Sequence, residues 1–225
     1  MTSRASLLPT VEYGGWLSQV REQPTFDPSL NLQRESVYLK TVELPSFRTW
    51  RSTDSIVLGR FLTPTREVYL SRARKLGVPV LHRSSGGGAV FHDLGNINYS
   101  IYVPQGFATG YGIARSLRAF SFPITRLLDS LGVPWSWEPP NNVYAKGRKI
   151  SGSAQARSGG RLLHHGTLLV ESDLDKMTQL LKPGGRSNPA PVVNLSEIVS
   201  GITVEEITEA LEAELRRCGC PCPAL

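Results

Sequence analysis

The stretch Arg83–Asn96, with the sequence RSSGGGAVFHDLGN, concentrates residue types that can hold an anion. Three consecutive glycines are costly in backbone entropy, so a chain uses them where the backbone adopts a positive φ or approaches a ligand closely. Backbone amides that converge in such a loop beside Arg83 predict a site for a carboxylate or a phosphate. On the glycines alone, a tight turn between two strands is the alternative. His92, Asp93 and Asn96 favour the ligand site, because a plain turn does not need so many polar groups.

A second stretch, residues 141–155 with the sequence NNVYAKGRKISGSAQ, places one lysine in a strand-like context. Neighbouring residues of a strand point to opposite faces, so with Ile150 in the core Lys149 faces solvent or a cleft. In a cleft, the Lys149 ammonium holds an anion as a point charge. For an isolated strand lysine, solvation is the more common fate. Gly152, between two serines, indicates close approach of another backbone or of a ligand.

A third stretch, residues 162–170, begins with the pair His164 and His165. Adjacent histidines on a strand point to opposite faces, so the pair is a poor metal site. Hydrogen bonding within the core is the expected role for both rings.

Local signals predict the elements that position these stretches. Asp27 as N-cap and Pro28 at the first helical position predict a helix to about Leu39. Further helices are expected at residues 65–76 before Gly77, at 113–131 with a break at Pro123, from a Ser172 cap to Leu181, and after the Thr203–Glu206 capping box. Strands are expected at residues 49–51, 55–61, 78–81, 97–103, 135–138 and 162–170, with a hairpin over 143–153 that turns at Lys146-Gly147. Loops are expected at residues 106–112 and 183–191. Because strands and helices mix without strict alternation, we predict an α+β fold with a mixed or antiparallel sheet packed with helices.

Composition narrows the function classes. The chain has 225 residues, 40% of them apolar and 20% charged, as in ordinary soluble domains. No apolar run reaches the ~20 residues that a membrane span needs, and the first residues lack a signal-peptide core, so we expect a cytoplasmic protein without a membrane partner. The net charge of +6 favours acidic partners. Because the basic residues are scattered, an acidic protein partner is favoured over nucleic acid, and a solvated basic surface without a partner is the alternative.

Familiar catalytic motifs are missing from the sequence. There is no P-loop, which excludes a P-loop NTPase. The absence of a Gly-x-Ser-x-Gly elbow and of a Gly-x-Gly-x-x-Gly after a strand argues against an α/β-hydrolase and a Rossmann dinucleotide site. The three cysteines, Cys218, Cys220 and Cys222, all lie in the last eight residues. No cysteine nucleophile therefore reaches the central site unless this tail folds back over it.

In the order and length of its motifs, the chain resembles the lipoate–protein ligase A family, within the class II synthetase-like biotin/lipoate ligase fold. The resemblance rests on three runs, at residues 83–96, 147–154 and 164–169, with weaker support from Val193-Asn194-Leu195 and from Asn31-Leu32 with Glu35. It implies a catalytic domain over residues 27–215, preceded by an N-terminal segment at 1–26 and followed by a disordered Cys/Pro tail at 216–225. It also implies a short form without the C-terminal accessory domain of the long ligases.

The family reaction has two steps, and the resemblance assigns residues to it. Lipoate or octanoate and ATP, with Mg²⁺, give an acyl-AMP and pyrophosphate, and the acyl group then passes to a lysine of a carrier domain. Lys149 is implied as the catalytic residue, at the bond between carbonyl and phosphate. Contacts to the lipoyl group or acyl-adenylate are implied for Arg83, Ser85, Gly86, Gly87, Gly88, His92, Asn96, Ser151, Gly152, Ser153, His165, Gly166 and Thr167. Asn141 and Asn142 are implied as nucleotide and magnesium contacts, with Mg²⁺ brought by the nucleotide and no site made by the protein alone.

The implied partner is an acidic lipoyl-carrier domain, such as the glycine cleavage H protein or a 2-oxo acid dehydrogenase acyltransferase. This chain departs from the family pattern at Asn142, where aspartate is usual, at His82, where arginine is common, and at Leu62, where glutamine is frequent. Similar short ligases need a separate small subunit to form the adenylate, so an accessory subunit is a possible second partner. The alternative within the fold is a lipoyl or octanoyl transferase that works between carriers without ATP, but such relatives use a cysteine nucleophile.

Overall fold

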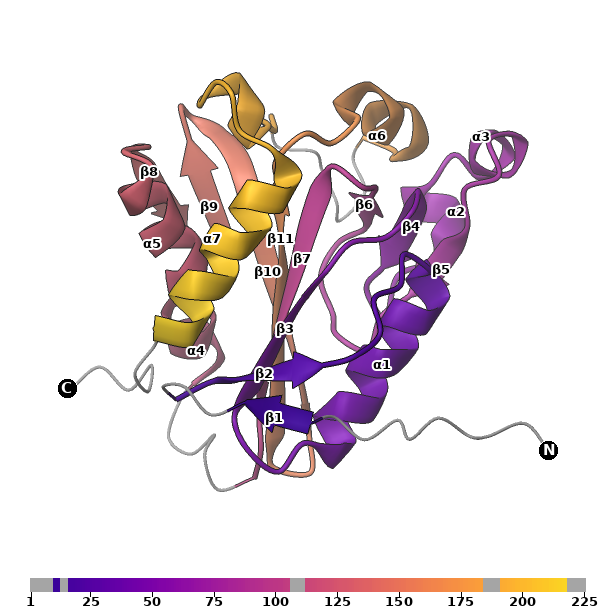
Figure 1. Cartoon of the computed structure of the whole chain (residues 1–225). Helices are drawn as coiled ribbons and strands as arrows, with labels where there is room; N and C mark the ends of the chain where they lie inside the picture. The colour runs from indigo at the N-terminus through magenta and orange to yellow at the C-terminus, as the bar shows by residue number, and fades with distance from the viewer. Residues whose placement is uncertain (1–9, 13–15, 106–111, 184–190, 218–225) are drawn as a thin grey trace.

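The structure, a computed structural model, describes residues 10–12, 16–105, 112–183 and 191–217 (Figure 1). The strands are β1 (Thr10–Glu12), β2 (Ser18–Arg21), β3 (Ser46–Trp50), β4 (Ser55–Leu58), β5 (Val80–His82), β6 (Val90–His92), β7 (Asn96–Val103), β8 (Trp135–Glu138), β9 (Asn142–Ala145), β10 (Arg148–Ser158) and β11 (Arg161–Leu169). The helices are α1 (Pro28–Thr41), α2 (Pro64–Glu67), α3 (Leu70–Lys75), α4 (Ile113–Ala119), α5 (Phe122–Ser130), α6 (Leu174–Leu180) and α7 (Val204–Arg217), with a short 3₁₀ turn at Leu195–Glu197.

Two sheets organise the molecule. The large sheet has the order β1-β2-β3-β7-β11-β10-β9-β8, antiparallel except for the parallel β2–β3 pair. The small sheet has the order β5-β4-β6, in which β4 pairs parallel with β5 and antiparallel with β6. Both sheets are thus mixed or antiparallel, and helices cover them, which confirms the predicted α+β class.

The two faces of the large sheet carry different helices, as Figure 1 shows. Along β7, Ile101 belongs to the core cluster that includes α5 and α7, whereas its neighbour Tyr102 packs in a second cluster with Tyr38 and Leu39 of α1. This alternation follows from the two-residue period of a strand. Because both faces are covered, all eight residues of β7 are buried.

The small sheet packs with α3 and α6 and forms a third core cluster, which includes Ile56, Leu58, Phe91 and Leu180. The glycine run lies between β5 and β6 of this sheet. The loop is therefore held at both ends by strands that pair with β4.

Several local predictions are confirmed. The Asp27 side chain caps α1 by accepting from the backbone N–H of Leu30, at 2.8 Å. The β9–β10 hairpin turns at Lys146 and Gly147, both with positive φ. Thr203 and Glu206 form the reciprocal hydrogen bonds of a capping box at the start of α7.

Other predictions of elements are wrong, and local contacts explain why. The helix expected at residues 65–76 is split into α2 and α3, because Val68 is extended and forms a bridge with Leu181. In the segment 113–131 the break falls at Phe120–Ser121, before Pro123, because proline is tolerated in the first turn of a helix. The cap of α6 is Asp173 rather than Ser172.

Strand β6 lies inside the stretch that was interpreted as one loop, and its pairing with β4 is the tertiary contact that forms it. The strands β1 and β2 show that part of the segment 1–26 joins the large sheet. Helix α7 runs to Arg217, two residues into the stretch predicted as a tail. The cysteines and most of the loops expected at 106–112 and 183–191 lie outside the described residues.

Candidate active site

A pocket of about 280 Å³ lies where the glycine run, β10, β11 and α1 meet. Part of its wall is apolar and includes Leu32, Trp50, Leu169, Met177 and Leu181. Another part is polar and includes Lys149, Asn142 and Thr167. A pocket of this composition suits a ligand with an alkyl chain and an anionic end.

The Arg83 side chain fixes the conformation of the glycine run through hydrogen bonds to its backbone. Its guanidinium donates to the carbonyl oxygens of Val57 at 3.1 Å, Gly86 at 2.7 Å and Gly88 at 2.8 Å. Burial lowers the pKa of Arg83 to about 10. The side chain was expected beside a ligand anion, and it does line the pocket, but its hydrogen bonds shape the loop.

The glycines of this region allow two backbone segments to pack closely against each other. Gly87 has a φ of +94°, which few side chains tolerate. A Cβ on Gly59, which follows β4, would lie 2.1 Å from the carbonyl oxygen of Gly87. Glycine at position 59 therefore lets the end of β4 pack directly on the loop.

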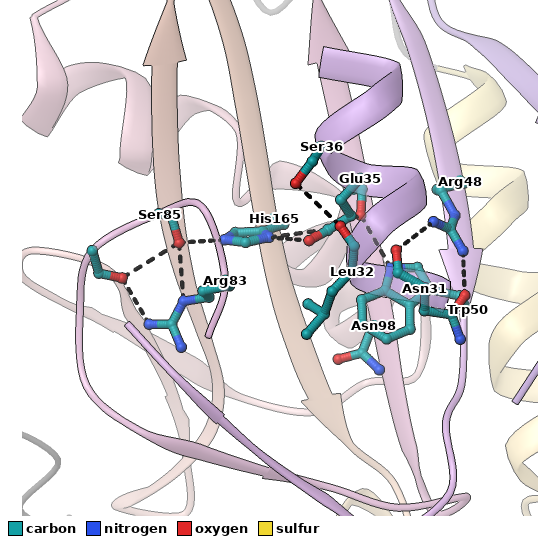
Figure 2. Close-up of polar contacts among 12 residues, drawn as sticks. Asn31, Leu32, Glu35, Ser36, Arg48, Trp50, Arg83, Ser85, Asn98 and His165 are labelled. Carbon is teal, nitrogen blue, oxygen red and sulfur yellow. Dashed lines mark hydrogen bonds and ion pairs between the residues drawn. The ribbon is translucent and has the colours of Figure 1, made fainter. Parts of the chain in front are cut away.

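A buried hydrogen-bonded chain ties the loop to α1 (Figure 2). The hydroxyl of Ser85 lies 2.6 Å from Nε2 of His165, whose Nδ1 lies 3.0 Å from both carboxylate oxygens of Glu35. Ser100 donates to Glu35 at 2.5 Å, and Arg83 donates to the Ser85 hydroxyl at 2.9 Å. The chain of contacts thus links the loop, β11, β7 and α1.

The order Ser85, His165, Glu35 is that of a hydrolase triad, but the surroundings of the serine differ. Ser85 is 1% exposed, does not line the pocket, and its oxygen already accepts from a guanidinium. A nucleophile must reach its substrate and keep its lone pairs available. The three residues therefore act as a tether for the loop.

We expect Glu35→Ala to lower the free energy of unfolding by about 3 kcal/mol, because it leaves the buried donors of His165 and Ser100 without an acceptor. His165, Ser100 and Arg48 hold the pKa of Glu35 below its ordinary value, against the opposing effect of burial. The Glu35 carboxylate therefore contributes fully to the free energy of unfolding at pH values above the ordinary glutamate pKa. This contribution is lost as the pH falls through the lowered pKa of Glu35. Urea unfolding at several pH values measures both effects. Glu35→Gln, which keeps an acceptor, is the matched variant, and equal stability of all three proteins would contradict the tether.

Lys149 of β10 also lines the pocket. The β9–β10 register shifts between Lys149 and Ser151, and the Lys149 backbone pairs with the segment after residue 190, donating to the Pro191 carbonyl at 2.7 Å. A Cβ built on Gly152 would lie 2.7 Å from the Lys149 Nζ, so the side chain crosses this glycine. Burial and the nearby charge of Arg83 lower the pKa of Lys149.

Asn142 begins β9 and pairs with Gly152, the glycine that the Lys149 side chain crosses, and Asn141 precedes this strand. The Asn141 amide donates to the Ser153 carbonyl, and the Asn142 Oδ1 lies 3.4 Å from a Cβ built on Gly152. Both residues line the pocket. A carboxamide oxygen can approach a hydrated cation, but it lacks the charge of a carboxylate.

His92 and Asn98 bring unpaired polar atoms to the pocket wall. Both ring nitrogens of His92 and the Asn98 Nδ2 are buried without a protein partner. Burial, followed by the charge of Arg83, lowers the pKa of His92 to about 3, so the ring is neutral at physiological pH. His164, by contrast, contacts Gln155 and Tyr99 within the core, as expected.

The structure brings most residues that the sequence predicted into this one pocket. Those that line it are Arg83, Gly87, Gly88, His92, Asn141, Asn142, Lys149, Ser151, Gly152, Ser153, His165, Gly166 and Thr167. The others do not line it: Ser85 belongs to the tether, the Gly86 carbonyl accepts from Arg83, and Asn96 is buried and donates to Asn98.

Sequence reasoning missed Glu35 and Trp50 as parts of the site, although both line the pocket. Glu35 is a buried carboxylate of α1, four residues after the buried Asn31. Two polar residues at a helical spacing are only a weak signal of a site in the sequence. No local signal distinguishes Trp50, because its role comes from an edge contact with the His92 ring, 5.5 Å between centroids.

Among the described residues, no cluster of three or more histidine, cysteine, aspartate or glutamate side chains is arranged to hold a metal ion. The residues present do fit an anionic ligand that carries its own cation, because the Lys149 ammonium and two carboxamides face the same pocket. Within the same part of the chain, no helix is long and apolar enough to cross a membrane.

Comparisons with known proteins agree with this geometry. The profile of the family described as lipoyl protein ligase A/B catalytic domain matches residues 27–216. The bi-partite lipoate protein ligase of Thermoplasma acidophilum, studied with its E2 lipoyl domain, is 26% identical with a TM-score of 0.77, covering 91% of this chain and 83% of its own. A lipoate-protein ligase A bound with ATP is 27% identical with a TM-score of 0.76, covering 90% and 84%. LipL1 of P. falciparum in complex with lipoate is 27% identical with a TM-score of 0.72, covering 86% and 60%.

Proposed function

The chain belongs to the lipoyl protein ligase A/B catalytic domain family, and we propose that it is an ATP-dependent lipoate–protein ligase. In this proposal it converts lipoate or octanoate to an acyl-adenylate and transfers the acyl group to a lysine of a lipoyl-carrier domain. The observation that carries the proposal is the pocket, in which an apolar wall, a glycine run and one partly buried lysine meet.

In the first step, a carboxylate oxygen of the acid attacks the α-phosphorus of ATP, and pyrophosphate leaves with the bonding electron pair. The Lys149 ammonium neutralises charge that develops on the oxygens. The apolar wall around Trp50 and Leu32 binds the alkyl chain and excludes water. Asn141 and Asn142 are the residues that would lie beside a nucleotide-bound Mg²⁺, which would supply charge neutralisation at the phosphates.

In the second step, the carrier's lysine amine attacks the acyl carbon, AMP leaves with the electron pair of the acyl–oxygen bond, and the amine loses one proton. The mixed anhydride is already activated, so the protein needs no nucleophile of its own. We assign Lys149 to stabilise the oxygen charge in this step as well. The partly buried position of Lys149 in the pocket wall supports that assignment, since electrostatic stabilisation is stronger where water is excluded.

The similar structures support the finer points of this proposal. One relative is bound with ATP, another is in complex with lipoate, and a third is a bi-partite ligase studied with its E2 lipoyl domain. By analogy with the third, we propose a lipoyl domain as acceptor and a separate small subunit as a possible requirement for adenylation. The carboxamide of Asn142 fits such a requirement, because it binds a cation less strongly than a carboxylate does.

The first test is lipoate-dependent exchange of labelled pyrophosphate into ATP, measured for the chain alone and with a candidate small subunit. We expect exchange well above a blank without lipoate, because adenylate formation is reversible on the enzyme. Absence of exchange in both conditions would contradict the adenylation step.

The second candidate function is acyl transfer between carriers without ATP. All three cysteines lie outside the described residues, so the described part of the chain contains no cysteine nucleophile. An acyl-thioester trapped on Cys218, Cys220 or Cys222 and seen by mass spectrometry would favour the transferase over the ligase.

A further inference from the structure

We propose that the surface formed by Arg60, Phe61, Arg66 and His82, named here the Phe61 surface, is where the acidic carrier domain docks. This inference rests on the function proposed above and deepens it. It assigns the place at which a protein substrate meets the ligase.

The strand topology places the Phe61 surface beside the glycine run. Strands β4 and β5 are parallel, and Leu58 pairs with His82 at their carboxyl ends. Residues 59–62 continue from β4, and the glycine run continues from β5, so both leave the same edge of the small sheet. The backbone N–H of Arg60 donates to the Ser85 carbonyl at 2.8 Å, which joins the two segments directly.

Phe61 is the most exposed large apolar side chain among the described residues, at 79%. A single exposed apolar residue needs no explanation by itself. Here, however, the guanidinium of Arg60 lies 5.5 Å from the centre of the Phe61 ring, and the Arg60 backbone is bonded to the loop whose glycines line the pocket of the proposed acyl transfer. Aromatic and arginine side chains are the residue types that protein interfaces favour.

The charge of the chain segment that carries Phe61 indicates the partner. Between residues 59 and 82 the exposed charged residues are all basic: Arg60, Arg66, Arg72, Arg74 and Lys75. The single acidic residue of this segment, Glu67, is buried. A positive field of this kind attracts an acidic domain and speeds its encounter.

The partner is a protein rather than a nucleic acid because of what lies beside the surface. Lys149 and an apolar wall line the pocket, and in the function proposed above this pocket transfers an acyl group to an amine of the acceptor. A folded acidic domain that rests on the Phe61 surface can present a lysine to this pocket.

The test uses the full chain, synthetic lipoyl-adenylate and an E2 lipoyl domain that lacks its lipoyl group. We expect Phe61→Ala and the double variant Arg60→Ala/Phe61→Ala to raise the KM for the lipoyl domain by about tenfold or more, since aromatic and arginine anchors carry most interface energy. Transfer to hydroxylamine, a small amine that needs no docking, should stay unchanged. Arg60→Ala alone should make the KM less dependent on salt.

The matched control is Ile113→Ala on α4, which removes a side chain that is 63% exposed and does not belong to the Phe61 surface. An unchanged KM for the lipoyl domain in the double variant would overturn the docking surface. Competition by duplex DNA that disappears in the same variant would also overturn it and assign the surface to nucleic acid. Because the adenylate is supplied, these results are independent of pyrophosphate exchange, whose absence would count against the proposed ATP step alone.

Discussion

Lys149→Ala is expected to lower both pyrophosphate exchange and carrier modification by about 100- to 1,000-fold, the loss typical of a removed charge-stabilising group. Lys149 lies in the pocket wall, and the proposed reaction develops negative charge on oxygen in each of its two steps. The loss should appear mainly in kcat, because an interaction made in the transition state is removed. Exchange and single-turnover transfer from synthetic lipoyl-adenylate measure the two steps separately.

The control for this variant comes from the same hairpin. Lys146 is exposed in the β9–β10 turn, with a φ of 48° that asparagine tolerates. Lys146→Asn should therefore remove one lysine charge without loss of activity. If Lys149→Ala retained the activity of the Lys146→Asn protein, Lys149 would have no part in the mechanism.

The same lysine predicts a pH effect with a definite sign. Burial and the charge of Arg83 lower its pKa, so the ammonium loses its proton at a lower pH than an ordinary lysine does. The exchange rate, which does not involve the carrier amine, should fall as the pH rises through that lowered pKa. A Lys149→Ala protein has no such group, and its residual exchange should lack the fall.

Gly152→Ala is expected to reduce transfer by about 100-fold while the protein stays folded, because a small misplacement of a reacting group has an effect of that size. A Cβ at this position would lie 2.7 Å from Nζ and 2.8 Å from Cε of Lys149. Both atoms belong to the flexible end of the lysine side chain, so in the variant we expect this side chain to shift while the strand stays in place. Gly152 has no positive φ that alanine would strain.

Two measurements separate this displacement from general damage. The free energy of unfolding in urea should change by less than about 1 kcal/mol, as for substitutions that only move an adjustable side chain. Gly112→Ala, at a glycine with open space and no positive φ, is the matched control and should leave transfer unchanged. Full transfer activity in Gly152→Ala would show that the position of Nζ does not matter.

Much of the architecture follows from short-range signals in the sequence. The Asp27 cap, the Lys146-Gly147 turn and the capping box at Thr203 depend on hydrogen bonds and backbone conformations within a few residues, so they can be predicted locally. The glycine run likewise predicted a site at residues 83–96, whereas the alternation around Ile150 left Lys149 to face either solvent or a cleft. These features need no knowledge of distant residues.

The contents of the pocket were decided by tertiary structure. Glu35 contacts His165, which is 130 residues further along the chain, and Ser85 contacts the same ring across 80 residues. No local pattern encodes such pairs, so the sequence placed Ser85 with the ligand, whereas packing places it in a tether. The split of the helix expected at residues 65–76 has the same origin, since Val68 bridges to Leu181. The sequence by itself determined which residues can do chemistry, and the long-range packing of buried polar groups decided which of them face the pocket, because a buried donor or acceptor must find its partner wherever the fold provides one.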